Sequence, residues 1–251
     1  AGQLIAATGL SETRIGGGLG ALINSPSPET IPALKSKVLF EDSVSIKEGL
    51  KAFQLLDAED PSLQINWDEH FQELHIHVMG VIQLEVLEQI VKDRFGFTVA
   101  FGNPEILYKE TITDTVTGYG HFEPLRHYAE VHLKIEAAER GSGVALANLC
   151  HADDLSTGNQ NLVLHHLSER DHHGLLTGSP LTDVQITLLT GRGHKEHTSG
   201  GDFREAAYRA LRQGLEKAQN RLLEPMYRFK ISTSIDFMGK VLSDIQQAHG
   251  K

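Results

Sequence analysis

The segment from Leu181 to Pro225 constrains the fold most, because it fixes a strand, a loop and a helix in one continuous order. The stretch LTDVQITLLTG predicts a strand over 181–191, and the glycine-rich RGHKEHTSGG predicts a loop over 192–201. A long basic helix is expected from DFREAAYRALRQGLEKAQNRLLEP, over 202–225. These elements complete an α/β domain that spans 118–223.

The earlier part of this domain shows further strand and helix signals. We expect a long strand from His121 to Ile135, a turn at 140–143 and a second strand over 144–149. A loop that carries Asp153 and Asp154 then leads to a helix that ends near His173.

Residues 35–112 predict a second complete domain. Ser45 followed by Glu48 is a capping-box pattern that opens an amphipathic helix, and Gly96 ends another helix that begins near Val81. Strands are expected before, between and after these helices, the last of them at 98–101 and 106–111. The order βαββαβ is typical of a ferredoxin-like fold, so the fold class is α+β.

The two ends of the chain predict incomplete pieces. Residues 1–33 hold one strand, a turn, a glycine run and a proline-marked linker, which cannot bury a core alone. Residues 225–251 predict one strand and one helix.

Charge is unevenly distributed along the chain. The whole carries a formal net charge of −10, whereas residues 190–230 contain more Lys and Arg than Asp and Glu. A basic end on an acidic body is suited to a molecule that presents one tip to RNA, although a solvated helix face gives the same pattern.

The loop over 192–201 combines groups that recognise RNA. Arg192 and Lys195 can reach phosphates, and glycines on both sides let the backbone approach closely. Hydroxyl and imidazole groups of the loop can bond to bases or ribose. The predicted RNA-binding residues are Arg192, His194, Lys195, His197, Thr198, Ser199 and Arg204.

Several of these segments resemble elongation factor G and the tetracycline-resistance ribosomal protection proteins. The resemblance rests on LDAEDPSLQI, ELHIHVMGVIQLEVLEQIVKDRFGFTV, GNPEILYKETI and the loop around His194. It identifies 35–112 with domain III and 118–223 with domain IV, whose fold is that of ribosomal protein S5 domain 2. The end pieces then correspond to the close of β-barrel domain II and the start of domain V. Gln83 stands where elongation factor G has His, which favours the ribosomal protection branch.

The resemblance implies a partner and a mode of action. The loop would enter the small-subunit decoding site, near ribosomal RNA and the A-site tRNA and mRNA, during translocation or during protection against tetracycline. GTP and magnesium would belong to an N-terminal part of the parent protein, since no GxxxxGK[ST] motif occurs here. The chain itself would be a monomeric, cytoplasmic, non-enzymatic fragment without a membrane contact.

Two other functions compete with this prediction. Fourteen histidines, several in pairs, would suit a metal-dependent enzyme, although a zinc site needs three or four convergent ligands. The acidic composition would also suit a structural interaction module. No GxSxG elbow is present, and no metal ligand or catalytic residue is assigned.

Overall fold

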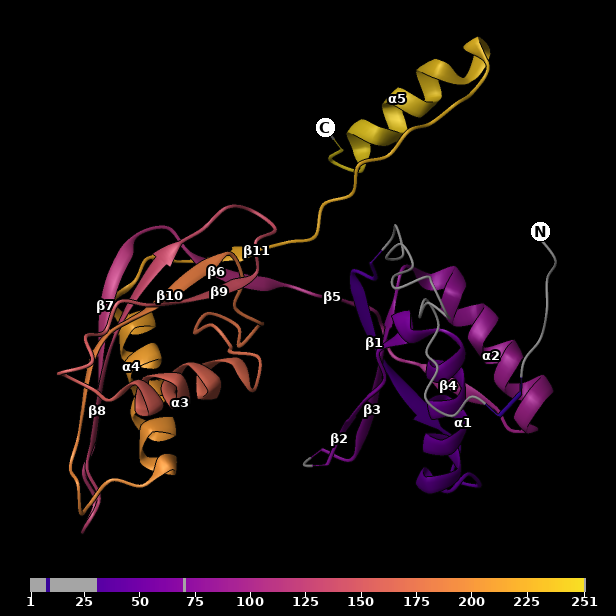
Figure 1. Cartoon of the computed structure of the whole chain (residues 1–251). Helices are drawn as coiled ribbons and strands as arrows, with labels where there is room; N and C mark the ends of the chain where they lie inside the picture. Colours follow the sequence, from indigo (N-terminus) through magenta and orange to yellow (C-terminus); the bar gives the residue numbers. More distant parts are fainter. Residues whose placement is uncertain (1–7, 10–30, 70, 251) are drawn as a thin grey trace.

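The computed structural model describes residues 8–9, 31–69 and 71–250. These residues form two α+β bodies and a C-terminal helix that stands apart from both in Figure 1. The fold class predicted from the sequence is confirmed. Most of the expected N-terminal remnant, 1–33, and its glycine run lie outside the described residues.

The first body is a ferredoxin-like unit. It contains β1 (Leu34–Phe40), α1 (Ile46–Glu59), a 3₁₀ turn η1 (Pro61–Leu63), β2 (Asn66–Asp68), β3 (Glu73–Val78), α2 (Val81–Phe95) and β4 (Val99–Phe101). The strands pair antiparallel in the order β2-β3-β1-β4. Alternation in β3 turns Leu74, Ile76 and Val78 into a core that also contains Phe53 and Val91.

The helix boundaries of this body follow the local sequence signals. The Ser45 hydroxyl accepts a hydrogen bond from the Glu48 backbone N–H at 3.2 Å and so caps the start of α1. Gly96 follows α2 with φ of +77°, the left-handed conformation that ends helices at low cost in glycine.

The strand expected over 106–111 is divided between two sheets. β5 (Glu105–Ile106) pairs with β1, whereas β6 (Lys109–Ile112) pairs antiparallel with β11 (Asn220–Leu223) in a separate ladder. The predicted single strand at the end of the first body is therefore wrong, because β6 finds its hydrogen-bonding partner more than a hundred residues further along the chain.

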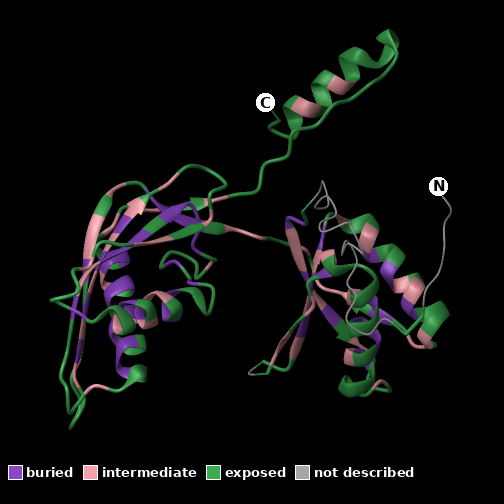
Figure 2. Ribbon diagram, viewed as in Figure 1, coloured by how far each residue is buried: buried purple, intermediate pink, exposed green. Residues whose placement is uncertain are grey.

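The second body places two helices on one face of a four-stranded sheet (Figure 1). Its elements are β7 (Thr115–Phe122), β8 (Ala129–Ala137), β9 (Val144–Asn148), α3 (Thr157–Ser168), β10 (Val184–Gly193) and α4 (Gly200–Lys217). The sheet order is β7-β8-β10-β9, with only β9 and β10 parallel. Figure 2 shows the buried residues concentrated where α4 meets the sheet.

Two glycines of β7 let α4 lie directly on the sheet. A Cβ atom at Gly118 would stand 1.9 Å from the Ala210 carbonyl oxygen, and one at Gly120 would stand 1.8 Å from that of Ala206. Glycine is required at both places because the helix backbone, which cannot shift independently, occupies the space of a side chain.

Three expectations for this body are wrong. The long strand from His121 to Ile135 is a hairpin, β7 and β8, interrupted by a loop in which Arg126 has φ of +65°. Pro124, which lacks an N–H, cannot continue the strand pairing there. α3 ends at Ser168 rather than near His173, and α4 ends at Lys217, after which 220–223 form β11.

A buried carboxylate organises the segment between α3 and β10. Glu110 of β6 is fully buried and accepts hydrogen bonds from the backbone N–H groups of Leu176, Thr177 and Ser179 at 2.8 to 3.1 Å. Burial alone would raise the pKa of Glu110, but these bonds outweigh it and hold the pKa below its ordinary value. The Glu110 carboxylate therefore stays ionised although it is buried.

The C-terminal segment contains a short 3₁₀ turn η2 (Ile235–Phe237) and α5 (Met238–Gln247). The predicted helix is present, but over the described residues after Leu223 no strand forms. A strand needs a hydrogen-bonding neighbour, and none of the named ladders includes residues from this segment. In the part of the chain that the structure describes, no helix has the length and apolar character to cross a bilayer.

Candidate nucleic-acid interface

Two loops meet at one end of the second body. One is the loop 194–199 between β10 and α4, and the other is the hairpin loop 123–128 between β7 and β8. The Tyr128 backbone N–H donates to the His197 carbonyl oxygen at 2.9 Å, which holds the loops side by side. We call these two loops, together with Arg192 at the end of β10, the tip.

Thr198 ties the tip together through its side chain. Its hydroxyl donates to the Tyr128 carbonyl oxygen at 2.6 Å and accepts from the His194 backbone N–H at 2.6 Å. One side chain therefore fixes both the conformation of the loop 194–199 and its distance from the hairpin loop.

Asp202 connects the start of α4 to both loops. Its carboxylate accepts from the Ser199 N–H at 2.7 Å and from the His127 ring nitrogen Nδ1 at 3.0 Å. Burial would raise the pKa of Asp202, but the bonds from Ser199 and His127 outweigh it and keep the pKa below its ordinary value. A buried carboxylate at a helix N-terminus also interacts favourably with the helix dipole.

The exposed groups of the tip include cations and imidazoles beside two carboxylates, Glu123 and Glu196. Arg192, His194, Lys195 and His197 are exposed, and the rings of His194 and His197 stack with their centroids 4.6 Å apart. Among the described residues no ion pair involves Arg192 or Lys195. Both side chains are therefore available to phosphate oxygens.

A hollow of about 420 Å³ lies between the two loops. Leu125 is 92% exposed at its rim. The lining residues are Glu123, Pro124, Leu125, Arg126, His127, Tyr128, His194 and His197.

A hydrogen-bonded cluster on the open face of the sheet supports Tyr128. The Tyr128 hydroxyl donates to the Glu130 carboxylate at 3.0 Å, and the His132 ring lies 2.6 Å from the same carboxylate. Burial, followed by the bond to Glu130, raises the pKa of Tyr128, whereas the bond from His132 lowers the pKa of Glu130. The phenol thus stays protonated and keeps its bond to Glu130.

The structure brings six of the seven predicted residues to the tip and places the seventh elsewhere. Arg204 lies one turn into α4 and forms a bidentate pair with Glu169, beyond the end of α3, at 2.7 and 3.1 Å. Hydrogen bonds from Tyr208 and Arg204 lower the pKa of Glu169 to about 2. Ser199 is the residue that precedes α4, where its N–H is held by Asp202.

Sequence reasoning missed the hairpin loop, including His127 and Tyr128. The available signal was Pro124, which marks an interruption between two apolar stretches. The pairing of this loop with a segment about seventy residues later has no local signal at all.

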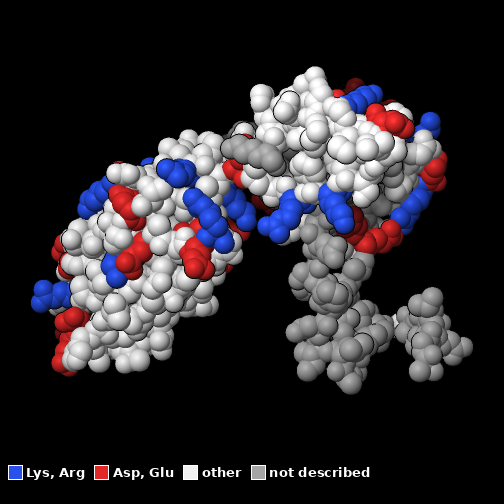
Figure 3. Space-filling model, turned by 90° about the horizontal axis from the view of Figure 1, so that it is seen from above, with Lys and Arg blue, Asp and Glu red and all other residues white. Residues whose placement is uncertain are grey.

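The described residues contain no group of three or more His, Cys, Asp or Glu side chains placed to hold a metal ion. Cys150 is partly buried, and burial raises the pKa of its thiol, which disfavours the reactive thiolate. Figure 3 shows Lys and Arg interspersed with Asp and Glu over the face seen from above, rather than one field of a single sign.

One comparison with known proteins matches the second body, and two others extend over most of the chain. Residues 104–219 match the family model described as elongation factor G, domain IV, which includes the tip. The curated tetracycline resistance protein TetP of Clostridium perfringens is 31% identical over 217 residues, which cover 86% of this chain and 33% of that protein. A crystal structure of a protein from Thermus thermophilus matches with a TM-score of 0.68 at 25% identity, covering 90% of this chain and 34% of that one.

These findings show that the chain is elongation factor G-like. They confirm the resemblance predicted from the sequence. The chain spans about a third of the length of the relatives that it matches.

Proposed function

We propose that this chain is the ribosome-contacting part of an elongation factor G-like translation factor. The tip would enter the small-subunit decoding site, with Arg192 and Lys195 on phosphates and the stacked His194 and His197 against bases or ribose. The observation that carries the proposal is the tip itself: two loops joined by Thr198, with unpaired cations exposed, within the domain that matches elongation factor G domain IV.

The mechanism that we propose is mechanical. A rigid tip on a well-packed α/β body transmits force or blocks a site without doing chemistry. GTP and magnesium would be bound by another part of a longer parent protein, and hydrolysis there would bias which domain arrangement the ribosome binds. One relative is named for tetracycline resistance. Protection of ribosomes from the drug is therefore a role to test, alongside translocation. The setting would be the cytoplasm, where ribosomes work.

The test replaces Arg192, His194, Lys195 and His197 with alanine in the full-length parent. All four side chains are exposed, so the free energy of unfolding should change by only about 0.5 kcal/mol for each substitution. Ribosome-stimulated GTP turnover and tRNA movement should fall. The slope of log binding constant against log salt concentration should become shallower by roughly 0.7 to 0.9 for each phosphate contact removed.

A matched control replaces His173, His249, Lys92 and Lys240, which are exposed. His173 lies beside Pro180, before the start of β10, and the other three lie on α2 or in the C-terminal segment. The control likewise removes two imidazoles and two cations but should leave ribosomal activity unchanged. Wild-type rates and salt slope in the tip variant would refute the assignment of the tip.

A further inference from the structure

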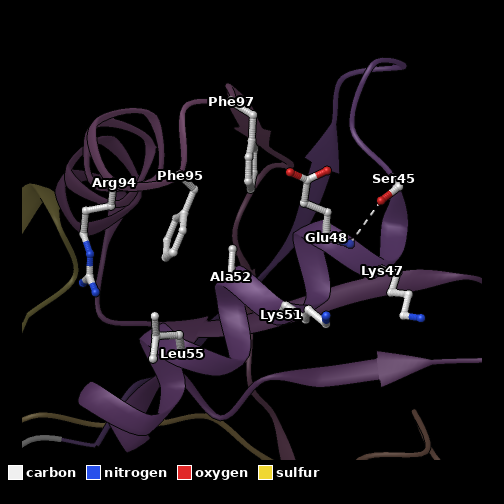
Figure 4. Close-up of a pocket in the computed structure, with 9 residues that line it drawn as sticks. All are labelled: Ser45, Lys47, Glu48, Lys51, Ala52, Leu55, Arg94, Phe95 and Phe97. Carbon is white, nitrogen blue, oxygen red and sulfur yellow. Dashed lines mark hydrogen bonds between the residues drawn. The ribbon is translucent and has the colours of Figure 1, made fainter.

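A groove opens on the first body, far from the tip in the sequence, between α1 and the C-terminal end of α2. Its volume is about 620 Å³, within the range of ligand and side-chain pockets. Figure 4 shows Phe95 and Phe97 on one side, pointing toward Ala52 and Leu55 of α1 on the other. It takes no part in the proposed ribosomal tip.

The walls of the groove are apolar. Leu55 is 48% exposed although it is a large hydrophobic residue, and Ala52 beside it is buried. Phe95 and Phe97 stack on each other with centroids 6.1 Å apart. Filling such a site with an apolar side chain removes these carbon atoms from water, which favours binding.

The phenyl rings of the groove already have partners from within the first body. The Arg94 guanidinium lies 5.4 Å from the centroid of the Phe95 ring, which also stacks on Phe97. Phe97 makes an edge contact with Phe40 at 6.5 Å. What the groove offers is therefore ring edges and aliphatic carbon, which suit an aliphatic side chain better than a stacked nucleobase.

The rim of the groove is positively charged. Lys47 and Lys51 are exposed on α1, and neither forms an ion pair with another residue in the described ranges. Arg94 adds a third cation but is held by Glu59 in a bidentate pair at 2.6 and 2.7 Å. Glu48 is the acid among the lining residues, so the local charge is positive on a chain whose net charge is −10.

We propose that this groove binds an acidic amphipathic helical segment of a protein partner. A leucine-type side chain would lie between Leu55 and Phe95, and carboxylates on the flanks of the segment would face Lys47 and Lys51. Helices that bind in grooves use such apolar anchors at i and i+4, while complementary charges at the rim set orientation and on-rate.

The experiment measures the binding of a fluorescent peptide by this 251-residue chain. The probe is a helical peptide with leucines at i and i+4 on one face and glutamates beside them, and its counterpart has lysines in place of the glutamates. We expect saturable binding of the acidic peptide only, weakened by about fivefold for each of Lys47→Glu and Lys51→Glu, and further weakened at high salt. Leu55→Asp should weaken binding by about tenfold.

Lys240→Glu changes the net charge equally but lies on α5, so it should leave the affinity within about twofold. Melting curves check that each variant is folded, and amide chemical shifts of residues 45–55 and 94–97 locate the peptide. Equal affinity for wild type and the three groove variants would overturn the proposal. So would binding of both peptides alike, or stronger binding of a uridine oligonucleotide at the same amides, which would indicate an RNA site instead.

Discussion

The Thr198 hydroxyl donates a 2.6 Å hydrogen bond to the Tyr128 carbonyl oxygen and thereby joins two loops that are 70 residues apart in the sequence. The same hydroxyl accepts from the His194 N–H. Together with the backbone bond from the Tyr128 N–H to the His197 carbonyl oxygen, this side chain holds the exposed cations and imidazoles of the tip on a fixed support.

Thr198→Val keeps the shape of the side chain but removes both hydrogen bonds. We expect a loss of about 1 to 2 kcal/mol in the free energy of unfolding, since the partners regain only part of the bonding from water. The larger effect should be local: the backbone amides of His194 and Tyr128 should exchange with solvent faster. Hydrogen exchange measured by NMR checks this, and Thr198→Ser, which keeps the hydroxyl, should restore protection. Unchanged exchange in Thr198→Val would show that the backbone alone holds the tip.

Gly120→Ala should lower the free energy of unfolding strongly, although it adds only one methyl group. The new Cβ would meet the Ala206 carbonyl oxygen at 1.8 Å, so α4 must move off the sheet, at a cost of about 3 kcal/mol or more. Gly158→Ala is the matched control, because it lies in α3 with no atom within 4 Å of the new Cβ. That substitution should stabilise by about 0.5 to 1 kcal/mol through helix propensity. Urea unfolding of both variants gives the comparison, and equal midpoints would contradict the close approach of α4.

Glu110→Ala should release the segment that the carboxylate holds. The backbone N–H groups of Leu176, Thr177 and Ser179 lose their acceptor, and we expect a destabilisation of about 2 to 4 kcal/mol. Limited proteolysis between residues 174 and 180 should become faster than in wild type. Glu105→Ala, which removes an exposed carboxylate from the first body, should leave that cleavage rate unchanged. Cleavage at the wild-type rate in Glu110→Ala would argue against the role of this carboxylate.

Glu169 should make stability depend on pH in acid. Bonds from Tyr208 and Arg204 lower its pKa from 4.5 to about 2 in the folded protein. A lowered pKa means that the stabilisation is fully present above about pH 4.5 and is lost as pH falls toward 2. Melting temperatures of wild type and Glu169→Gln should therefore differ at pH 7 and converge between about pH 4.5 and 2. A difference that stays constant over that interval would rule out this linkage.

Sequence by itself determined the elements whose signals are local. The cap at Ser45, the left-handed Gly96 and the alternation of Leu74, Ile76 and Val78 each act within a few residues, so the βαββαβ order was predictable. The composition of the loop 192–201 likewise indicated RNA chemistry, because cations, imidazoles and glycines within ten residues are visible in the sequence itself.

Only the tertiary structure decided which distant segments meet. The pairing of β6 with β11, the hairpin loop beside Thr198 and the turning of Arg204 toward Glu169 all join residues far apart in the chain. Such contacts depend on strand register and on the close approach of α4 at Gly118 and Gly120, which the packed core selects from many locally acceptable alternatives. A local sequence pattern determines whether a segment can form a helix or a strand. Burial and hydrogen bonding across the whole body determine which other segments it packs against or pairs with.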